Sequence, residues 1–414
     1  MEKKMKLLVV SQYFRPETFR INDICDGLRE RGWDIDVLTS LPNVPQGRFY
    51  KGYGWFHRGE RVDNGMNITR VGVIRRGTGN PVLWVLNCAS FAFNALFHLP
   101  ALLRRDYDAV FVFNNSPVTS IFPASVFAKK AGIPEIVYIL DIWPDSMFFL
   151  LGKPEQGTDL IHRIMDSVCR RLYNSADLIL ESSIGFKPRL RRLGVSSPVE
   201  YFPNYAEPPA DGAPERTRSG LGIPKDARVI GFAGNIGPAQ GLDLLAEAAQ
   251  NADPSLYYLM IGDGPSRSEL EDLVKKYGLS ERFMFTGWVP GTDVPGYLAL
   301  CDALLVSLKD SGVLNLTVPA KLQTYMLSGK PVIAFMNGAG ADTVTEAGCG
   351  YTAEADNVGA LRDVLDTVAA ADASDLLEKG ARGRDYCVEN FSREVLLDRL
   401  QEYIIRTVED YKKE

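Results

Sequence analysis

The sequence predicts an α/β protein with two parallel-sheet domains. Short apolar runs alternate with helix-like segments, and this alternation occurs twice along the 414 residues. Between the two series lies a stretch, 205–224, that is rich in proline, glycine, alanine and charge and is typical of a linker. We therefore expect one domain at residues 1–205 and a second at 206–389.

The first domain is predicted from unbroken apolar runs, which are typical of strands buried on both faces of a parallel sheet. We expect strands at residues 6–14, 33–39, 68–74, 107–113, 135–140, 176–181 and 199–203, and helices at 21–31 and 118–131. No GxGxxG follows the first strand, so the sequence gives little support to a dinucleotide site.

The second domain repeats this pattern, with glycine-rich turns after its strands. We expect strands at 229–233, 257–261, 283–289, 303–308 and 332–335, helices at 242–250 and 266–277, and a last helix that begins after Ser392 as its cap. The turns begin at Gly234, Gly262 and Gly287. Glycine lets a backbone approach a ligand closely, and a helix N-terminus favours an anion. Ligand sites of open α/β sheets collect at the carboxyl ends of the strands, where these turns lie.

The stretch 317–334 predicts a helix between two buried strands, with a lysine in its opening turns. Thr317 is expected as the N-cap and Pro319 in the first turn, while Gly329 suits a left-handed C-cap. Lys321 then places an ammonium beside free backbone N–H groups at the positive end of the helix dipole, as a phosphate group requires. The alternative is an ordinary crossover helix with a solvated lysine. The glycine turns favour the phosphate site.

Cysteine and histidine usage argues against a disulfide framework or a metal site. The six cysteines are scattered with no CxxC pair, and the three histidines are not spaced with cysteine or with one another. Asp34 and Asp36 fall within a predicted strand rather than a loop. The first residues run directly into a strand and lack the pattern of a signal peptide, so a reducing cytoplasm is expected.

A basic first half distinguishes this acidic protein, whose formal net charge is −6. Residues 1–205 contain 26 Lys and Arg against 20 Asp and Glu, and residues 46–105 contain nine against two. In 43–64, aromatic residues such as Trp55 interleave with basic ones such as Arg58. This charge balance points toward an anionic surface or ligand.

Residues 81–103 are strongly apolar and are followed by Arg104 and Arg105. Their length would just allow a membrane span, but their polar positions argue against one. Residues from Trp84 to His98 recur at helical spacing, which suits a helix that packs one face and leaves another apolar. Two interpretations stay open: a buried core helix, or an interfacial membrane helix flanked by arginines.

One carboxylate of the first domain is placed as a ligand-binding residue would be. Asp141 lies just past the strand predicted at 135–140, at the carboxyl end where open α/β sheets gather their ligands. The alternative is that Asp141 is the N-cap of a helix that begins near Pro144.

Taken together, the motifs resemble those of retaining glycosyltransferases of the GT-B fold, family 4, over nearly the whole chain. The sequence looks closest to the subgroup similar to fucosamine transferases of bacterial polysaccharide assembly. Each motif is modest alone, but their order and spacing are specific. The residues that carry the resemblance are 10–17, 141–146, Pro203-Asn204, 234–241, 261–265, 285–288, 318–322 and 328–331.

The resemblance implies two Rossmann-like domains that face a cleft, with a C-terminal helix, 390–414, packing back onto the first domain. It implies that the second domain binds a nucleotide-diphosphate sugar and that the first binds the acceptor. Lys321 is expected at the diphosphate and Asp141 at the transferred sugar, as catalytic residues. The other donor-site residues implied are Gly234, Asn235, Gly237 and Gln240 at the diphosphate, Gly262, Asp263, Gly264, Gly287 and Trp288 at the nucleoside, and Thr324.

The sequence departs from the family pattern in three places. The paired glutamates of the family fall at Leu316 and Thr324. The Arg and Lys usual in the first phosphate turn are replaced by Asn235 and Gln240, and a Gly-Gly pair is replaced near residues 18–20. Some members of the subgroup carry a Val-Pro-(Ala/Ser)-Lys-Leu version of the helix start, which implies that Lys321 compensates.

The activity implied is retaining transfer of a sugar to a hydroxyl of a lipid-linked saccharide in cell-surface polysaccharide biosynthesis. The donor would be a UDP- or GDP-linked hexose, N-acetylhexosamine or deoxy sugar, and the acceptor would be linked to undecaprenyl pyrophosphate. No cofactor, metal or nucleic acid is expected. The basic first half suggests an anionic membrane as a further partner, which predicts a peripheral protein on the inner face of the plasma membrane. Acceptor or membrane contacts are expected from Arg15, Trp55, Arg58, Trp84, Arg104 and Arg105.

Two other functions fit parts of the sequence. A catalytically silent GT-B subunit that binds a partner or a glycan is favoured by the missing glutamates and disfavoured by the intact Lys321 segment. A sugar-nucleotide epimerase has a similar two-domain build, and product analysis without an acceptor would separate it from a transferase.

Overall fold

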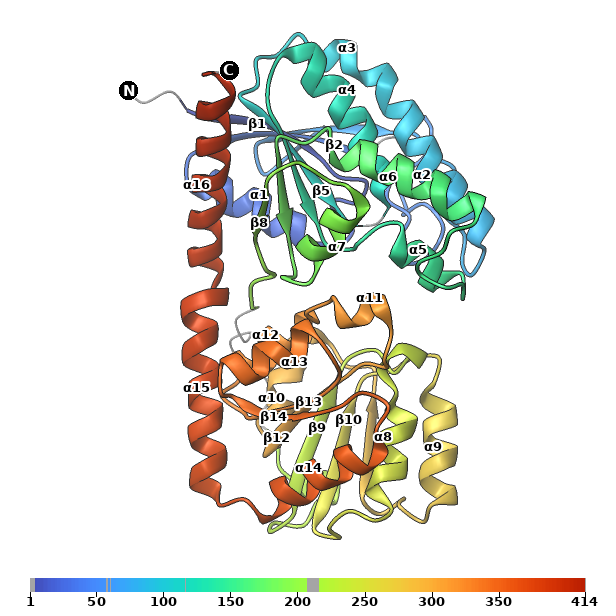
Figure 1. Ribbon diagram of the computed structural model, residues 1–414, viewed down its shortest axis with the longest axis vertical. Helices are drawn as coiled ribbons and strands as arrows, with labels where there is room; N and C mark the ends of the chain where they lie inside the picture. Colours follow the sequence, from blue (N-terminus) through green and yellow to red (C-terminus); the bar gives the residue numbers. More distant parts are fainter. Residues whose placement is uncertain (1–3, 57–58, 60, 116, 207–215, 414) are drawn as a thin grey trace. The chain divides into compact units, whose positions relative to one another are not determined.

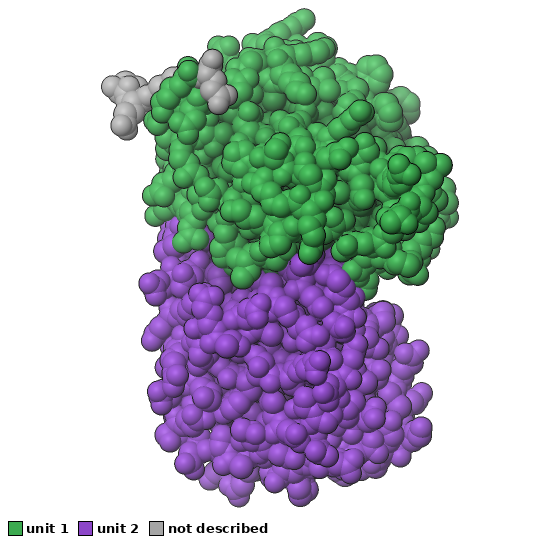
Figure 2. Space-filling view, viewed as in Figure 1, with its two compact units in different colours: residues 1–202, 397–414 green, residues 203–396 purple. Residues whose placement is uncertain are grey.

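The computed structural model describes residues 4–56, 59, 61–115, 117–206 and 216–413. The chain divides into two compact units, one of residues 1–202 with 397–414 and one of residues 203–396 (Figure 2). Each unit contains one sheet of mainly parallel strands covered by helices (Figure 1). Residues 390–396, which were expected with the returning helix, belong to the second unit.

The first sheet has eight strands in the order β3-β4-β2-β1-β5-β6-β7-β8. All neighbouring strands are parallel except β3 and β4. The chain moves outward from β1 on one side and restarts at β5 on the other, which creates a topological switch point between these two strands. The strands are β1 (Lys6–Val10), β2 (Asp34–Ser40), β3 (Val62–Asp63), β4 (Met66–Val71), β5 (Ala109–Asn114), β6 (Glu135–Ile139), β7 (Leu178–Glu181) and β8 (Val199–Tyr201).

The helices of the first unit include one from the far end of the chain. Helices α2, α4 and α6 lie beside one another (Figure 1). Helix α16 packs on this unit through buried Leu397, Leu400 and Ile404, and Arg31 Nε donates to Asp398 Oδ1 at 2.9 Å. The helices are α1 (Arg20–Glu30), α2 (Pro81–Ala95), α3 (Leu99–Leu102), α4 (Ile121–Ala131), α5 (Asp145–Leu150), α6 (Leu160–Tyr173), α7 (Phe186–Leu193) and α16 (Arg393–Tyr411), with 3₁₀ turns at 96–98 and 118–120.

The second sheet has six parallel strands in the order β11-β10-β9-β12-β13-β14. Its switch point lies between β9 and β12, because the chain moves from β9 through β10 to β11 and then returns to the other side of β9. The strands are β9 (Arg228–Ala233), β10 (Leu256–Ile261), β11 (Phe283–Gly287), β12 (Ala303–Ser307), β13 (Val332–Phe335) and β14 (Gly350–Ala353).

Two apolar cores cover the two faces of the second sheet. Successive side chains of a strand point to opposite faces, so Ile230 and Phe232 pack into one core while Val229 packs into the other. Helices α8, α9 and α14 cover the first of these faces, and α10, α12, α13 and α15 cover the second. The helices are α8 (Leu242–Ala249), α9 (Arg267–Lys276), α10 (Val294–Leu298), α11 (Gly312–Asn315), α12 (Ala320–Leu327), α13 (Ala339–Glu346), α14 (Val358–Ala370) and α15 (Ala373–Phe391), with 3₁₀ turns at 219–221, 238–240 and 291–293.

The structure corrects several sequence-based expectations. Thr317 is not the N-cap of the lysine-bearing helix: α12 begins at Ala320, and the Thr317 hydroxyl donates to the Val313 carbonyl at 2.9 Å. Gly329 has the predicted left-handed conformation, with φ at 70°. The first strand ends at Val10, and residues 11–14 belong to the loop that follows it. The segment 81–103 is divided between α2, a 3₁₀ turn and α3.

Candidate functional site

The glycine turns of the second unit meet at the carboxyl edge of its sheet. The turn after β9 begins at Gly234, the turn after β10 at Gly262 and the turn after β11 at Gly287. Gly234 N donates to Ile261 O at 2.9 Å, and Gly262 N donates to Gly287 O at 3.0 Å. The three turns are therefore joined by their own backbones, next to the β9–β12 switch point where open α/β sheets bind ligands.

Two of these glycines allow an approach that no other residue permits. Gly234 has φ of 138° and Gly262 has φ of 128°. A β-carbon at position 262 would lie 2.1 Å from the Gly234 carbonyl oxygen, and one at position 234 would lie 3.2 Å from Lys321 Nζ. Side chains here would push the turns apart and crowd the ammonium.

Lys321 is the second residue of α12, and its ammonium reaches the Gly234 turn. Nζ lies 4.0 Å from the centroid of the Phe232 ring, a cation–π contact. Within the described part of the chain, Lys321 has no ion-pair or hydrogen-bond partner. Burial lowers its pKa to about 8. A poorly solvated ammonium at a helix start gains from an anionic ligand that restores its counter-charge.

Two further cationic residues, Lys309 and Arg267, border the same turns and were not predicted. Lys309 follows β12; its backbone N donates to Ala239 O at 2.9 Å and its Nζ lies 3.4 Å from Asp243 Oδ2. A β-carbon at Gly287 would come within 3.0 Å of Arg267 Nη1. Lys309 carried a usable signal, because it directly follows a predicted strand at the edge where the turns collect.

The remaining predicted donor residues lie around this centre. Gln240 Oε1 accepts from Gly237 N at 3.1 Å, so its side chain stabilises its own turn. Asp263 Oδ1 accepts from Gly264 N at 2.8 Å, and Asn235 is exposed.

On the outer side of the turns, Trp288 is 74% exposed. Thr324 lies one turn beyond Lys321 on α12 and is partly buried, as is Leu316 before the helix. The geometry thus brings the predicted diphosphate residues together and leaves Trp288 at the solvent-exposed rim.

Asp141 of the first unit follows β6, as predicted. Its carboxylate is partly buried and forms no hydrogen bond or ion pair with any other described residue. Burial raises its pKa above the ordinary aspartate value. The N-cap alternative is wrong, because α5 begins at Asp145 and Pro144 occupies its cap position. An unpaired carboxylate at a strand end remains available to a ligand.

Amide side chains hold α2 against the segments that follow β1 and β4. Gln12 Nε2 donates to Asn87 Oδ1 at 2.8 Å, and Asn87 Nδ2 donates to Ile74 O at 2.6 Å. Asn94 Nδ2 donates to Gly72 O at 2.7 Å. The polar side chains of α2 therefore face the protein, which inverts the usual amphipathic pattern.

The outward face of α2 is correspondingly apolar. The stretch Val82–Leu102 is the one helical segment among the described residues that is long and apolar enough to cross a membrane, and 33% of its most apolar window is buried. The interpretation as a buried core helix is therefore wrong. Large apolar side chains are exposed on α2 and on α6: Val82, Val85, Leu86, Phe93, Leu160, Ile161, Ile164 and Val168, together with Phe97 in the turn after α2.

The predicted acceptor or membrane residues are dispersed over the first unit. Arg15 pairs with Asp26 and with Asp63, the latter at 3.2 Å. Arg104 and Trp55 are exposed, the Trp84 ring contacts the Trp143 ring in a tilted arrangement, and Arg58 lies outside the described residues.

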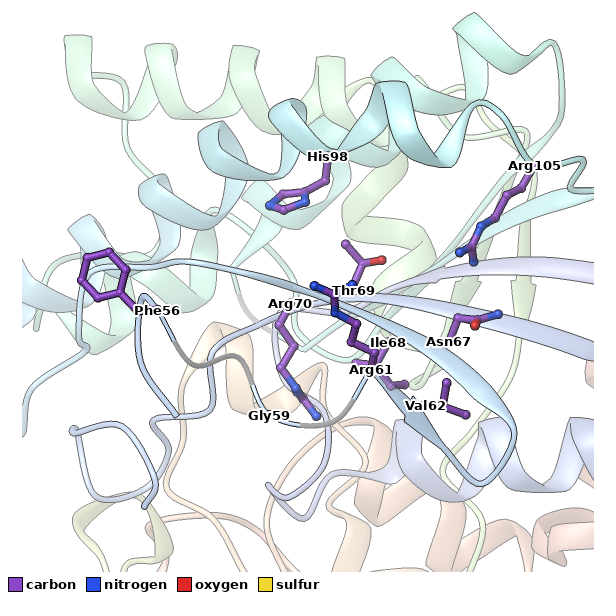
Figure 3. A pocket seen from close by; sticks show the side chains of 10 residues that line it. All are labelled: Phe56, Gly59, Arg61, Val62, Asn67, Ile68, Thr69, Arg70, His98 and Arg105. Atoms are coloured by element: carbon purple, nitrogen blue, oxygen red, sulfur yellow. The ribbon is translucent and has the colours of Figure 1, made fainter. Parts of the chain in front are cut away.

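Arg105 lies in a basic cavity of ≈ 730 Å³ along β3 and β4, with Arg61, Arg70 and His98 (Figure 3). Arg105 Nη1 donates to Asp36 Oδ2 at 2.6 Å, within the strand that was predicted to contain Asp36. Arg15 and Arg105 are thus engaged within the protein.

The sequence matches two family descriptions. Residues 18–205 match "Glycosyl transferase 4-like domain" and residues 214–380 match "Glycosyl transferases group 1". The 2-deoxystreptamine glucosyltransferase of Streptomyces kanamyceticus is 31% identical over 303 residues, which cover 70% of this chain and 75% of that protein. The chain belongs to the group 1 glycosyltransferases. This glycosyltransferase is also 26% identical over 362 residues to WcaI of Escherichia coli K12, a glycosyl transferase named for colanic acid biosynthesis, with 83% and 85% of the chains covered.

Solved structures agree with the GT-B fold of this glycosyltransferase. Anabaena Alr3699/HepE in complex with UDP superposes with a TM-score of 0.71 at 16% identity, over 97% of this chain and 100% of that one. WaaG, a glycosyltransferase of lipopolysaccharide biosynthesis, superposes with a TM-score of 0.64 at 16% identity, over 97% and 99%. The predicted glycosyltransferase family and the predicted α/β GT-B fold class are confirmed.

Proposed function

We propose that this glycosyltransferase moves a sugar, with retention of configuration, from a nucleotide-diphosphate sugar to a hydroxyl of a lipid-linked saccharide in cell-surface polysaccharide biosynthesis. The donor is a UDP- or GDP-linked hexose, N-acetylhexosamine or deoxy sugar. The second unit binds the donor and the first binds the acceptor. The observation that carries the proposal is the Lys321 ammonium, which has no ion-pair or hydrogen-bond partner among the described residues and lies beside the Gly234 turn, the first of the three linked glycine turns.

The proposed chemistry requires stabilisation of the leaving diphosphate as the sugar–oxygen bond breaks. Lys321 and the free N–H groups at the start of α12 supply fixed positive charge where negative charge develops. The acceptor hydroxyl attacks on the face from which the diphosphate leaves, and the departing phosphate takes its proton. Asp141 orients the acceptor or the sugar, and the reaction needs no metal ion.

The substrates are suggested by the proteins that resemble this chain. HepE is described in complex with UDP, and WaaG and the Rhizobium meliloti relative LpsD are named for lipopolysaccharide biosynthesis. LpsD is 31% identical over 146 residues. A lipid-linked acceptor also suits the exposed apolar side chains of α2 and α6, which would dip into the headgroup region of an anionic membrane. We place the protein on the cytoplasmic face of the plasma membrane.

The first experiment is a thermal-shift panel of UDP, GDP and their sugars, because binding of the native state raises the melting temperature. The selected donor is then incubated with membrane lipid extract, with and without EDTA, and the anomeric configuration of the product is assigned by NMR. Retained configuration and EDTA resistance are expected. Sugar-nucleotide isomerisation without acceptor would establish an epimerase, and no binding of any nucleotide would establish a silent subunit.

A further inference from the structure

We propose that an open pocket of the first unit binds the phosphate-bearing end of the lipid to which the acceptor saccharide is attached, an inference that rests on the proposed function. The pocket has a volume of ≈ 470 Å³. It is lined by the loop before α2, at Arg76, Gly77, Gly79 and Asn80, by Trp84 of α2, and by Leu150-Leu151 at the end of α5. One part of this lining is cationic and the other is apolar.

Arg76 supplies the cationic part. Its backbone N donates to Asn43 Oδ1 at 3.1 Å, and Nη1 reaches the Tyr13 hydroxyl at 3.5 Å. No carboxylate pairs with its guanidinium in the part of the chain that the structure describes. Neutral partners thus hold a partly buried arginine in place without neutralising it. A phosphate oxygen can provide the missing counter-charge, and guanidinium geometry suits such a group.

Trp84 and the two leucines supply the apolar part. Leu150 is 65% exposed and Leu151 is 47% exposed, although both are aliphatic. Val82 and Leu86 on the same helix as Trp84 are also exposed, so apolar surface continues beyond the pocket. A free nucleotide or sugar would leave these side chains in water. A hydrocarbon chain attached to a phosphate satisfies the arginine and covers the leucines at once.

The pocket borders the loop that carries Asp141. The rings of Trp84 and Trp143 have centroids 5.9 Å apart, and Trp143 N donates to the Tyr173 hydroxyl at 3.1 Å. Asp141 stands two residues before Trp143 on this loop. A lipid phosphate held at Arg76 would therefore keep its attached saccharide close to the loop of the unpaired carboxylate.

The test uses farnesyl pyrophosphate as the probe, with binding to the full chain measured by calorimetry in the presence of saturating UDP. UDP occupies the proposed donor site, so it removes pyrophosphate binding at Lys321. Arg76→Gln removes the charge, and Leu150→Ser with Leu151→Ser removes exposed apolar surface with little risk to folding. Arg75→Gln is the matched control, because Arg75 is the neighbouring arginine and does not line the pocket. Farnesol and inorganic pyrophosphate report the two halves of the probe.

We expect each pocket variant to weaken farnesyl pyrophosphate binding by about tenfold or more, since each removes one of two recognition elements. The control and the melting temperatures should not change, and farnesol and pyrophosphate should each bind more weakly than the probe. Unchanged affinity in both pocket variants, or complete displacement of the probe by UDP, would overturn the inference. UDP binding without probe binding refutes only the pocket, whereas probe binding without any nucleotide binding refutes the proposed function and leaves the pocket in place.

Discussion

Arg189 Nε donates to both carboxylate oxygens of Asp145, at 2.9 and 3.1 Å, and both side chains are buried. This pair joins α7 to α5 directly after the Asp141-Ile-Trp-Pro sequence. It divides the two aspartates of the motif by role, because Asp145 is committed to a structural partner whereas Asp141 has none among the described residues. The first pair of predictions follows from that division.

Replacing Arg189 with leucine should lower the free energy of unfolding by about 3 kcal/mol, because it leaves the Asp145 carboxylate buried without a counter-charge. Urea denaturation would measure the loss. Asp141→Asn is the contrasting variant: it should leave the urea midpoint close to that of the wild type while it reduces sugar transfer. Equal stability losses in the two variants would show that Asp141 is structural as well.

Lys321→Ala should reduce sugar transfer by about a hundredfold or more, as the loss of one charge-stabilising donor does. The measurement is kcat with the donor selected by the thermal-shift panel. Lys330→Ala is the matched control, since Lys330 lies just past the other end of α12 and its Nζ reaches the Ala299 carbonyl. Near-normal turnover in Lys321→Ala would remove the proposed role of this ammonium.

The affinity for UDP should depend on pH through Lys321. Its pKa in the free protein is about 8, below the ordinary lysine value, so the ammonium loses its proton as pH rises through that value. A bound diphosphate favours the charged form, and binding then takes up a proton. Above pH 8 we expect the affinity to fall toward about tenfold per pH unit. Lys321→Arg, which does not titrate in this range, should bind UDP without that slope; an unchanged slope would assign the titration to another group.

The same shift has a consequence for stability without ligand. A depressed lysine pKa costs folding free energy below about pH 8, and the cost disappears as pH rises toward the pKa of lysine in the unfolded chain, about 10.4. Lys321→Met should therefore raise the melting temperature at neutral pH. A lower melting temperature would contradict the expectation that burial of this ammonium costs stability.

Gly262→Ala should abolish UDP binding, because its β-carbon would meet the Gly234 carbonyl and separate the turns. Gly278→Ala is matched to it: Gly278 also has positive φ, at 70°, but open space around its β-carbon position. Both variants should lose about 1–3 kcal/mol of stability to backbone strain. Only the first should lose nucleotide binding in a calorimetric titration, and retention of binding there would mean that the turns tolerate separation.

Replacing Phe93 and Phe97 together with serine should reduce binding to anionic vesicles several-fold, about the effect of removing two interfacial aromatic side chains. The two side chains are 64% and 82% exposed, so the fold should not suffer. Flotation at low salt measures the change. Leu377→Ser on α15 is the control, with a similarly exposed side chain in the other unit. Equal flotation of all three proteins would exclude this surface as the membrane contact.

The turns and Lys321 could be predicted because each is marked by a local pattern. A buried apolar run followed by glycine identifies the carboxyl end of a strand, and the sheet topology brings those ends together. Lys309 has the same mark and could have been included. The cap of α12 could not be read from the sequence in the same way, because Thr317 instead completes the last turn of α11.

The partners of the first-unit arginines could not be predicted, because they are distant in the sequence. Arg15 meets Asp63, and Arg105 meets Asp36, only after the strands are assembled. The orientation of α2 was similarly hidden. Asn87 faces inward because its side chain forms hydrogen bonds with Gln12 and Ile74. A count of polar residues on the helix cannot reveal those partners.

Because helix α16 completes the first unit, the two units become complete at different times during synthesis on the ribosome. The second unit is complete once residue 396 has emerged. The first unit still exposes the surface that Leu397, Leu400 and Ile404 will cover until after that point. The eight-stranded sheet of the first unit therefore remains incompletely covered while the whole of the second unit is synthesised. In a nascent chain stalled near residue 390, that surface of the first unit would be accessible to chaperones and proteases.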